Sequence, residues 1–172
     1  MKSSSLQSNE YANFYKPYIE ALGEVVLMNE LELSLSFFID FLKTIPSEKH
    51  EFRYAEGKWT IKDIVQHLID AERIFAYRAL RIARKDKTPL PGFEENEYVE
   101  TAFANKREMN DLIEEFIMVR EATISLFKTF TEEQLLQMGT ASEKPVSVRG
   151  IGFITLGHQK HHEKIIKERY LK

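Results

Sequence analysis

Residues 59–84, WTIKDIVQHLIDAERIFAYRALRIAR, carry the strongest helical pattern in the chain and decide its fold class. Apolar residues recur there at intervals of three and four, which is the spacing of a helix buried along one face. Thr60 is a good N-cap and Asp63 stands three residues later, which predicts a capping box and a helix from residue 60 to about residue 84. Trp59 is expected to cover the start of this helix, with a place in a pocket wall as the alternative.

The same periodicity predicts three further long helices, over residues 24–44, 105–130 and 148–171, and a short helix over residues 131–139. Residues 140–146 are expected to form a loop, and Ser147 to cap the last helix. No stretch alternates as a strand does, so the prediction is an all-α protein built as a four-helix bundle. The connection over residues 85–103 is long enough to span such a bundle, which would let the helices on either side of it run parallel.

The N-terminal part of the chain is expected to lie outside the bundle itself. Residues 1–9 are polar and are predicted to form a mobile tail, while residues 10–23 are rich in aromatic side chains and are predicted to pack over the bundle. With 172 residues, the chain is expected to form a single domain over residues 1–172.

Composition narrows the classes of function. The net charge of −3 gives no basic surplus, so a nucleic-acid partner is not expected. The chain has no cysteine, which excludes disulfides, thiolate metal sites and cysteine nucleophiles. The N-terminus has no apolar stretch typical of a secretion signal, and no apolar run reaches the ~20 residues of a membrane span, so we expect a cytoplasmic protein that does not enter membranes.

Three histidines are candidate metal ligands. His158 and His162 are four residues apart, so they lie about 40° apart around their helix and about 6 Å apart along it. Both fall in the apolar stripe of that helix, where an unpartnered polar group is costly. His67 lies near the start of its own helix at a comparable height if the two helices run antiparallel. The alternative is that these are core histidines that hydrogen-bond within the protein, and the HExxH glutamate of a metalloprotease is absent.

Three further features bear on the site. His161 lies off the stripe and is expected to flank the ligands. Glu72 lies near the centre of the stripe of the residue 60–84 helix, where an ion pair with Arg78, Arg120 or Arg169 is the first interpretation, and support of the ligands or a role in proton transfer are the alternatives. The basic string RALRIARKDK, residues 78–87, is interpreted as a solvated helix end, with binding of an acidic group on a cosubstrate as the alternative.

At these residues the chain resembles the DinB superfamily, in particular its YfiT-type branch of metal-dependent hydrolases. The resemblance rests on segments that occur in the order typical of the family: RYAEGKWTIKDIVQHLIDAERIFAYRALRIAR, PLPGFEENEYV, EEFIMVREATISLF and GHQKHHEKIIKERYL. It implies a DinB-like bundle with up-down-down-up topology and homodimer formation. It also implies that His67, His158 and His162 hold one divalent transition metal, zinc or nickel, with open positions filled by water.

The resemblance leaves several functions open. Characterised relatives are transferases and isomerases that use low-molecular-weight thiols such as bacillithiol or mycothiol. We therefore expect a metal-dependent enzyme acting on a small-molecule substrate, most plausibly a thiol S-transferase in detoxification or stress response. A metal-dependent hydrolase is the first alternative, and no separate catalytic side chain is assigned in either case, because a metal-bound water or thiolate would react. The second alternative is a non-enzymatic stress-response protein with a structural metal, its coordination completed by Glu72 or His161.

Overall fold

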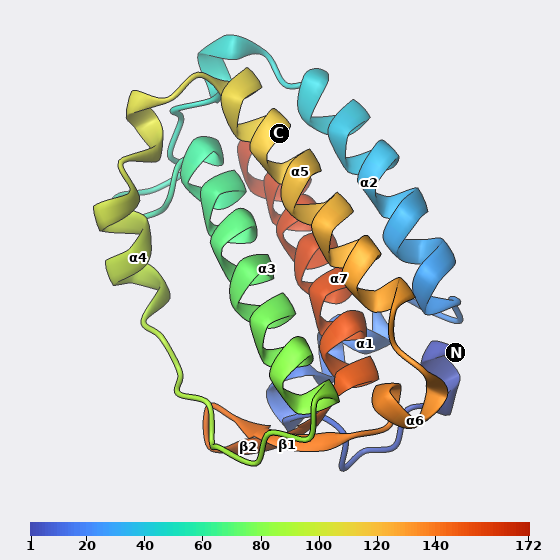
Figure 1. The fold of residues 1–172 in the computed structure, drawn as a ribbon. Helices are drawn as coiled ribbons and strands as arrows, with labels where there is room; N and C mark the ends of the chain where they lie inside the picture. The colour runs from blue at the N-terminus through green and yellow to red at the C-terminus, as the bar shows by residue number, and fades with distance from the viewer.

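Four long helices form a bundle in the computed structural model, which describes residues 1–172. They are α2 (Leu27–Lys43), α3 (Ile61–Ala83), α5 (Met109–Lys128) and α7 (Val148–Ile165). Figure 1 shows α2 running up, α3 and α5 running down, and α7 running up again. The predicted all-α fold with up-down-down-up topology is confirmed, and α3 and α7 are antiparallel.

The predicted capping residues start these helices. The Thr60 side chain accepts a hydrogen bond from the backbone N–H of Asp63 at 3.0 Å, and the Asp63 carboxylate accepts one from the backbone N–H of Thr60 at 2.9 Å. At the start of α7, the Ser147 hydroxyl accepts a hydrogen bond from the backbone N–H of Gly150 at 2.9 Å. Both caps satisfy backbone donors that the first helical turn leaves free. After α7 the chain adds a π-helical turn over Ile166–Tyr170.

The interior of the bundle contains two apolar clusters with a polar layer between them. One cluster lies at the end where α3 begins and includes Phe38, Ile64, Phe116 and Ile166. The other lies at the opposite end and includes Leu31, Phe75, Phe127 and Ile151. The polar layer takes one residue from each long helix: Ser34, Glu72, Arg120 and Gln159.

The N-terminal residues correct the prediction of a mobile tail, because they are packed. The backbone N–H of Leu27 donates to the carbonyl of Met1 at 3.0 Å, and Ser3 is buried. Glu10 is also buried, and its carboxylate accepts a hydrogen bond from Arg149 of α7 at 2.7 Å. The expectation failed because these residues are held by partners outside their own segment, both near α2, as for Ser3 with Val25, and far along the chain, as for Glu10 with Arg149.

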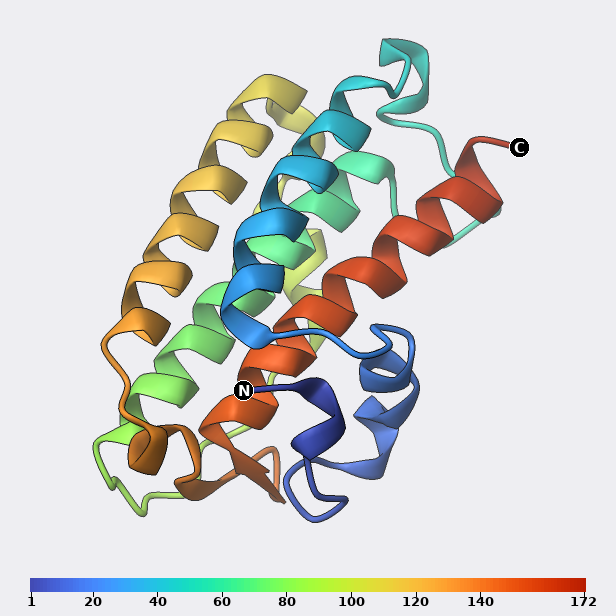
Figure 2. The same ribbon diagram turned by 90° about the vertical axis from the view of Figure 1, so that its right-hand side faces the viewer.

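Residues 10–23 pack over the bundle as predicted, with a short helix, α1 (Lys16–Glu20), lying against α7 (Figure 2). The approach is close at Gly157 of α7, where a Cβ atom would come within 2.5 Å of the Tyr18 carbonyl oxygen. A glycine at this position therefore lets the N-terminal segment reach the helix that carries two of the three candidate ligands.

The connections contain regular structure that the periodicity did not reveal. The long link between α3 and α5 includes α4 (Glu95–Ala102), and the predicted short helix is present as α6 (Glu132–Leu135). The loop expected over residues 140–146 is instead a hairpin of β1 (Met138–Ala141) and β2 (Lys144–Ser147), so the prediction of no strand was wrong.

The hairpin escaped prediction because its turn has an unusual sequence. Ser142 and Glu143 both have positive φ angles, of 50° and 62°, as a two-residue turn of type I′ requires. Asn-Gly or Asp-Gly would have marked such a turn, whereas Ser-Glu does not. The two strands have four residues each, too few for a clear alternation of apolar side chains.

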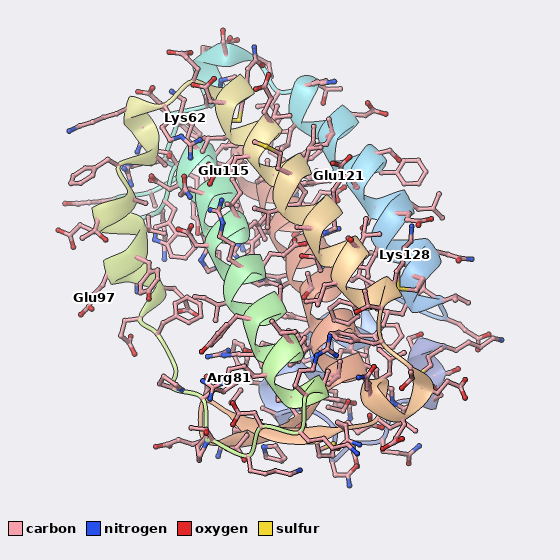
Figure 3. The ribbon with its side chains drawn as sticks, viewed as in Figure 1. Lys62, Arg81, Glu97, Glu115, Glu121 and Lys128 are labelled. Atoms are coloured by element: carbon pink, nitrogen blue, oxygen red, sulfur yellow. The ribbon has the colours of Figure 1, made fainter.

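Charged side chains lie along the outer surface of the bundle, and Figure 3 labels Glu121 and Lys128 of α5 among them. The ammonium group of Lys128 pairs with the carboxylate of Glu32 of α2 at 2.7 Å. We find no helix with the length and apolar character that crossing a membrane requires.

Candidate metal centre

The two antiparallel helices α3 and α7 bring the three candidate histidines together. His67 lies on the second turn of α3, and His158 and His162 lie on successive turns of α7. The Nε2 atom of His158 is 3.0 Å from Nε2 of His67 and 3.1 Å from Nε2 of His162. One ring nitrogen of each residue falls within 4.8 Å of the other two. The structure thus brings His67 and the pair of His158 and His162 together in one cluster.

Burial determines the charge of this cluster. The exposed fractions of His67, His158 and His162 are 4%, 8% and 8%. Burial lowers the pKa of His67 to about 4 and that of His162 to about 3, and it lowers the pKa of His158 well below its ordinary value. The three imidazoles are therefore neutral at pH 7, which is the form that binds metal ions.

The donor set fits a transition-metal ion. Three neutral Nε2 atoms point at one another. If these contacts were hydrogen bonds within the protein, each would need an N–H donor on one ring and an acceptor nitrogen on the other. In a tetrahedral zinc site with Zn–N bonds of about 2.0 Å, ligand nitrogens lie about 3.3 Å apart, close to the two separations in this cluster. The Nδ1 atom of His162 is buried without a hydrogen-bond partner. The cluster could hold one divalent ion with three protein ligands and at least one open position.

The cluster opens into a cavity of about 220 Å³. Most of the Phe, Tyr and Trp side chains in its walls come from segments outside the long helices, including Tyr15 and Tyr18 near the N-terminus and Phe93 before α4. Trp59 also lines the cavity, with its ring centroid 4.8 Å from that of His67. Trp59 also packs against the apolar cluster at the start of α3, so both interpretations of this residue, core cover and pocket wall, are confirmed.

The two residues expected beside the ligands have different neighbours. Glu72 is 3% exposed, and its two carboxylate oxygens accept hydrogen bonds from Arg120 at 2.7 and 2.9 Å, so the predicted ion pair is present. No hydrogen bond joins Glu72 to the three histidines. His161 lines the cavity and stacks on Tyr18 with ring centroids 4.6 Å apart, but it lies outside the cluster of converging nitrogens.

Polar residues line the far end of the cavity, and sequence reasoning missed two of the three. Arg78 lines it from α3, Glu95 from the start of α4, and Ser142 from the hairpin turn. Glu95 and Ser142 lie in connections that lacked a pattern, so no signal pointed to them. Arg78 did have a signal, because it follows His67 by eleven residues, or about three helical turns, and therefore shares its face of α3.

Comparison with known proteins places this architecture in a family. Residues 30–166, which include all three histidines, match the DinB superfamily. The chain belongs to the DinB superfamily. The match begins in the first turn of α2 and ends just after α7, so it contains nearly the whole bundle and leaves residues 1–29 and 167–172 outside it.

Two curated proteins resemble this DinB chain in sequence, and both have the provisional name of metal-dependent hydrolase. One, from Oceanobacillus iheyensis, is 28% identical over 166 residues, which cover 92% of this chain and 83% of that protein. The other, from Geobacillus thermodenitrificans, is 29% identical over 111 residues, which cover 63% of this chain and 62% of that protein. The match to the second protein thus spans less than two thirds of its length.

Solved structures share the DinB fold with this chain. YfiT from Bacillus subtilis, provisionally described as a metal-dependent hydrolase and with an unusual four-helix bundle topology, aligns with a TM-score of 0.75 and 15% identity over 83% of this chain and 82% of YfiT. A mycothiol-dependent maleylpyruvate isomerase aligns with a TM-score of 0.67 and 12% identity over 80% of this chain and 58% of the isomerase. At these identities the likeness establishes a common fold.

Proposed function

We propose that the protein is a metal-dependent enzyme in which His67, His158 and His162 bind one divalent ion, zinc or nickel. The observation that carries the proposal is the convergence of three buried, neutral imidazoles at a cavity large enough for a small molecule. A divalent ion held by neutral ligands keeps its full charge and lowers the pKa of a thiol or a water molecule that binds to it.

The reaction that we propose is transfer of a low-molecular-weight thiol to an electrophile. The thiol sulfur forms a bond to an electrophilic carbon, the leaving group departs with its electron pair, and the thiol proton passes to solvent. The chain has no cysteine, so the thiol must come with a substrate. Aromatic side chains such as Trp59 and Phe75 would exclude water from the reacting groups, which favours transfer to a thiol over transfer to water.

Hydrolysis is the second candidate, and the provisional names of the relatives favour it. It would need a group that removes a proton from the attacking water. The buried carboxylate of the polar layer, Glu72, is already engaged by Arg120, and Glu95 is the only acidic residue that lines the cavity. A structural metal is a weaker candidate, because neither Glu72 nor His161 lies in the cluster to complete a closed site.

The first experiment measures metal and activity together. Wild type, His158→Ala and His50→Ala are purified without a metal-affinity tag, analysed for bound metal, and assayed with a panel of small thiols and monochlorobimane. His50 lies in the loop after α2, and its ring contacts the carbonyl of Ile45, away from the cavity, so His50→Ala is the matched control. We expect about one metal ion per chain and thiol conjugation in wild type and His50→Ala, and loss of both in His158→Ala.

Two results would count against the proposal. Equal conjugation rates in wild type and His158→Ala would exclude a role for the cluster. Release of hydrolysed products from ester or amide substrates, without any thiol adduct by mass spectrometry, would favour the hydrolase instead.

A further inference from the structure

The bundle contains three buried arginines, and only two of them have a carboxylate partner. Arg120 donates to both carboxylate oxygens of Glu72, and Arg149 donates to both carboxylate oxygens of Glu10. Arg78 is 5% exposed, and no carboxylate lies within ion-pairing distance of its guanidinium. A buried charge without a counter-ion is costly, and this chain avoids that cost at its other two buried arginines.

The hydrogen bonds of Arg78 leave part of its guanidinium unused. Its Nη2 atom donates to the carbonyl of Pro91 at 2.6 Å and to the hydroxyl of Ser142 at 3.2 Å. Nε and Nη1 donate to no group of the protein, and the ring of Phe93 lies 6.0 Å from the guanidinium carbon. Burial lowers the pKa of Arg78, which still remains charged at neutral pH. These contacts hold the guanidinium in place and leave three N–H donors for a ligand.

Arg78 lines the same cavity as the histidine cluster. His67, Ala71, Phe75 and Arg78 all line it and follow one another along one face of α3. The α-carbons of His67 and Arg78 are about 16 Å apart along the helix axis. The guanidinium is held beside Pro91 and Ser142, and Ser142 lines the same cavity, so a ligand must span the cavity to reach both Arg78 and the cluster. The small side chain of Ala71 leaves room between the two ends.

We infer that Arg78 binds a carboxylate carried by the molecule that reaches the histidine cluster. The inference rests on the proposed function for the cluster and adds a substrate class, namely a small acid. A planar guanidinium with free Nε and Nη1 donors matches a carboxylate in two-point geometry. The carboxylate belongs either to the thiol or to its electrophile, since both must enter this cavity. Within the basic string over residues 78–87, Arg78 is the residue that we assign to carboxylate binding.

The first test compares two thiols of equal length. Cobalt-loaded full-length protein is titrated with 6-mercaptohexanoate and with 6-mercaptohexanol, and binding is followed by the thiolate-to-cobalt absorption. We expect wild type to bind the acid about tenfold or more tightly than the alcohol, the range of a charge-assisted hydrogen bond. Arg78→Gln should abolish this preference without weakening binding of the alcohol, and Arg78→Lys should retain part of it.

Ser142→Ala is the matched control. It removes one hydrogen bond of Arg78 and keeps the guanidinium, so it should keep most of the preference for the acid. Thermal unfolding and cobalt content of each variant show whether it is folded and loaded. Equal affinities for acid and alcohol in folded, loaded wild type, or an unchanged preference in Arg78→Gln, would overturn the inference while leaving the metal site intact.

A second arm locates the carboxylate on one of the two substrates. Turnover of 2-mercaptoethanol is measured with 4-(chloroacetamido)butanoate and with the corresponding amide. A preference for the acidic electrophile that Arg78→Gln removes assigns the carboxylate to the electrophile, whereas a preference confined to the mercaptohexanoate pair assigns it to the thiol.

A third arm keeps the inference testable if the protein binds no metal. Hexanoate and hexanamide are titrated against metal-free wild type and metal-free Arg78→Gln, and binding is followed by saturation-transfer NMR of the ligand signals. Saturable binding of hexanoate alone, lost in Arg78→Gln, supports the inference whatever the outcome for the metal. Binding of neither compound, or of both equally, contradicts it.

Discussion

Buried polar side chains in this bundle are arranged as sets with definite partners. Arg120 has no exposed surface, and it donates to Glu72 through Nε and Nη2 and to the Ser34 hydroxyl through Nη1. Gln159 donates to the Ser34 carbonyl at 3.2 Å and so joins α7 to the same layer. Each buried charge of this layer is thereby neutralised. The histidine cluster differs from the layer, because its ring nitrogens point at one another.

Breaking the Glu72–Arg120 pair should destabilise the fold without emptying the metal site. Glu72→Gln leaves a buried guanidinium without its counter-ion, so we expect the free energy of unfolding to fall by about 3–5 kcal/mol in urea titrations. The double variant Glu72→Leu/Arg120→Met removes both charges and should recover most of that loss. Metal content should match wild type in any folded variant, and a selective loss of metal in Glu72→Gln would show that this carboxylate supports the ligands.

At the scale of elements, the N-terminal segment completes one wall of the cavity. It is held at two places on α7: the close contact of Tyr18 with Gly157, and the ion pair of Glu10 with Arg149. Burial of Glu10 by itself would raise the pKa of its carboxyl group. Hydrogen bonds from Arg149 and Ser147 outweigh that effect and hold the pKa below its ordinary value of 4.5.

This depressed pKa predicts how stability depends on pH. Because the folded-state pKa is lower than the unfolded-state value, the stabilisation by Glu10 is complete above about pH 4.5 and is lost as pH falls through the folded-state pKa. We expect Glu10→Gln to be less stable than wild type at pH 7 and to lose less stability on acidification to pH 3, as measured by urea unfolding. Glu121→Gln changes an exposed carboxylate of α5 and should follow the wild-type curve. Parallel curves for wild type and Glu10→Gln would contradict the prediction.

At the scale of the whole molecule, a bound metal would join two antiparallel helices whose ligands are 91 residues apart in the sequence. The unfolded chain cannot hold His67 beside His158, so metal binding favours the folded state. The same ion would hold together the two helices that form the cavity, and so would couple stability to the shape of the binding site.

Metal should therefore raise the melting temperature of the metal-free protein. At a free metal concentration about 100-fold above the dissociation constant, binding contributes about 2.7 kcal/mol, which corresponds to roughly 5–10 °C for a chain of this size. Differential scanning calorimetry with and without zinc or nickel measures the shift. His158→Ala should show almost none, and His161→Ala should keep it. A wild-type shift no larger than that of His158→Ala would exclude specific binding at the cluster.

Local sequence signals were enough for the long helices and their order. Thr60 and Ser147 cap helices as predicted, and the length of the link before α5 allowed the parallel pair. The hairpin was missed because Ser142 and Glu143 adopt positive φ angles that their residue types do not announce. Docking of residues 1–9 was missed because it depends on contacts outside that segment, such as those of Ser3 with Val25 and of Ser5 with Arg149.

The sequence by itself determined the bundle and the spacing of His158 and His162, because helical periodicity is local and repeats every 3.6 residues. It also narrowed any transition-metal site to imidazole and carboxylate ligands, because the chain has no cysteine. Only the tertiary structure decided that His67 meets that pair, that Glu72 pairs with Arg120, and that Arg78 shares the cavity without a partner. Those relations depend on the distances and burial that arise when helices remote in sequence pack together, and no local pattern encodes them.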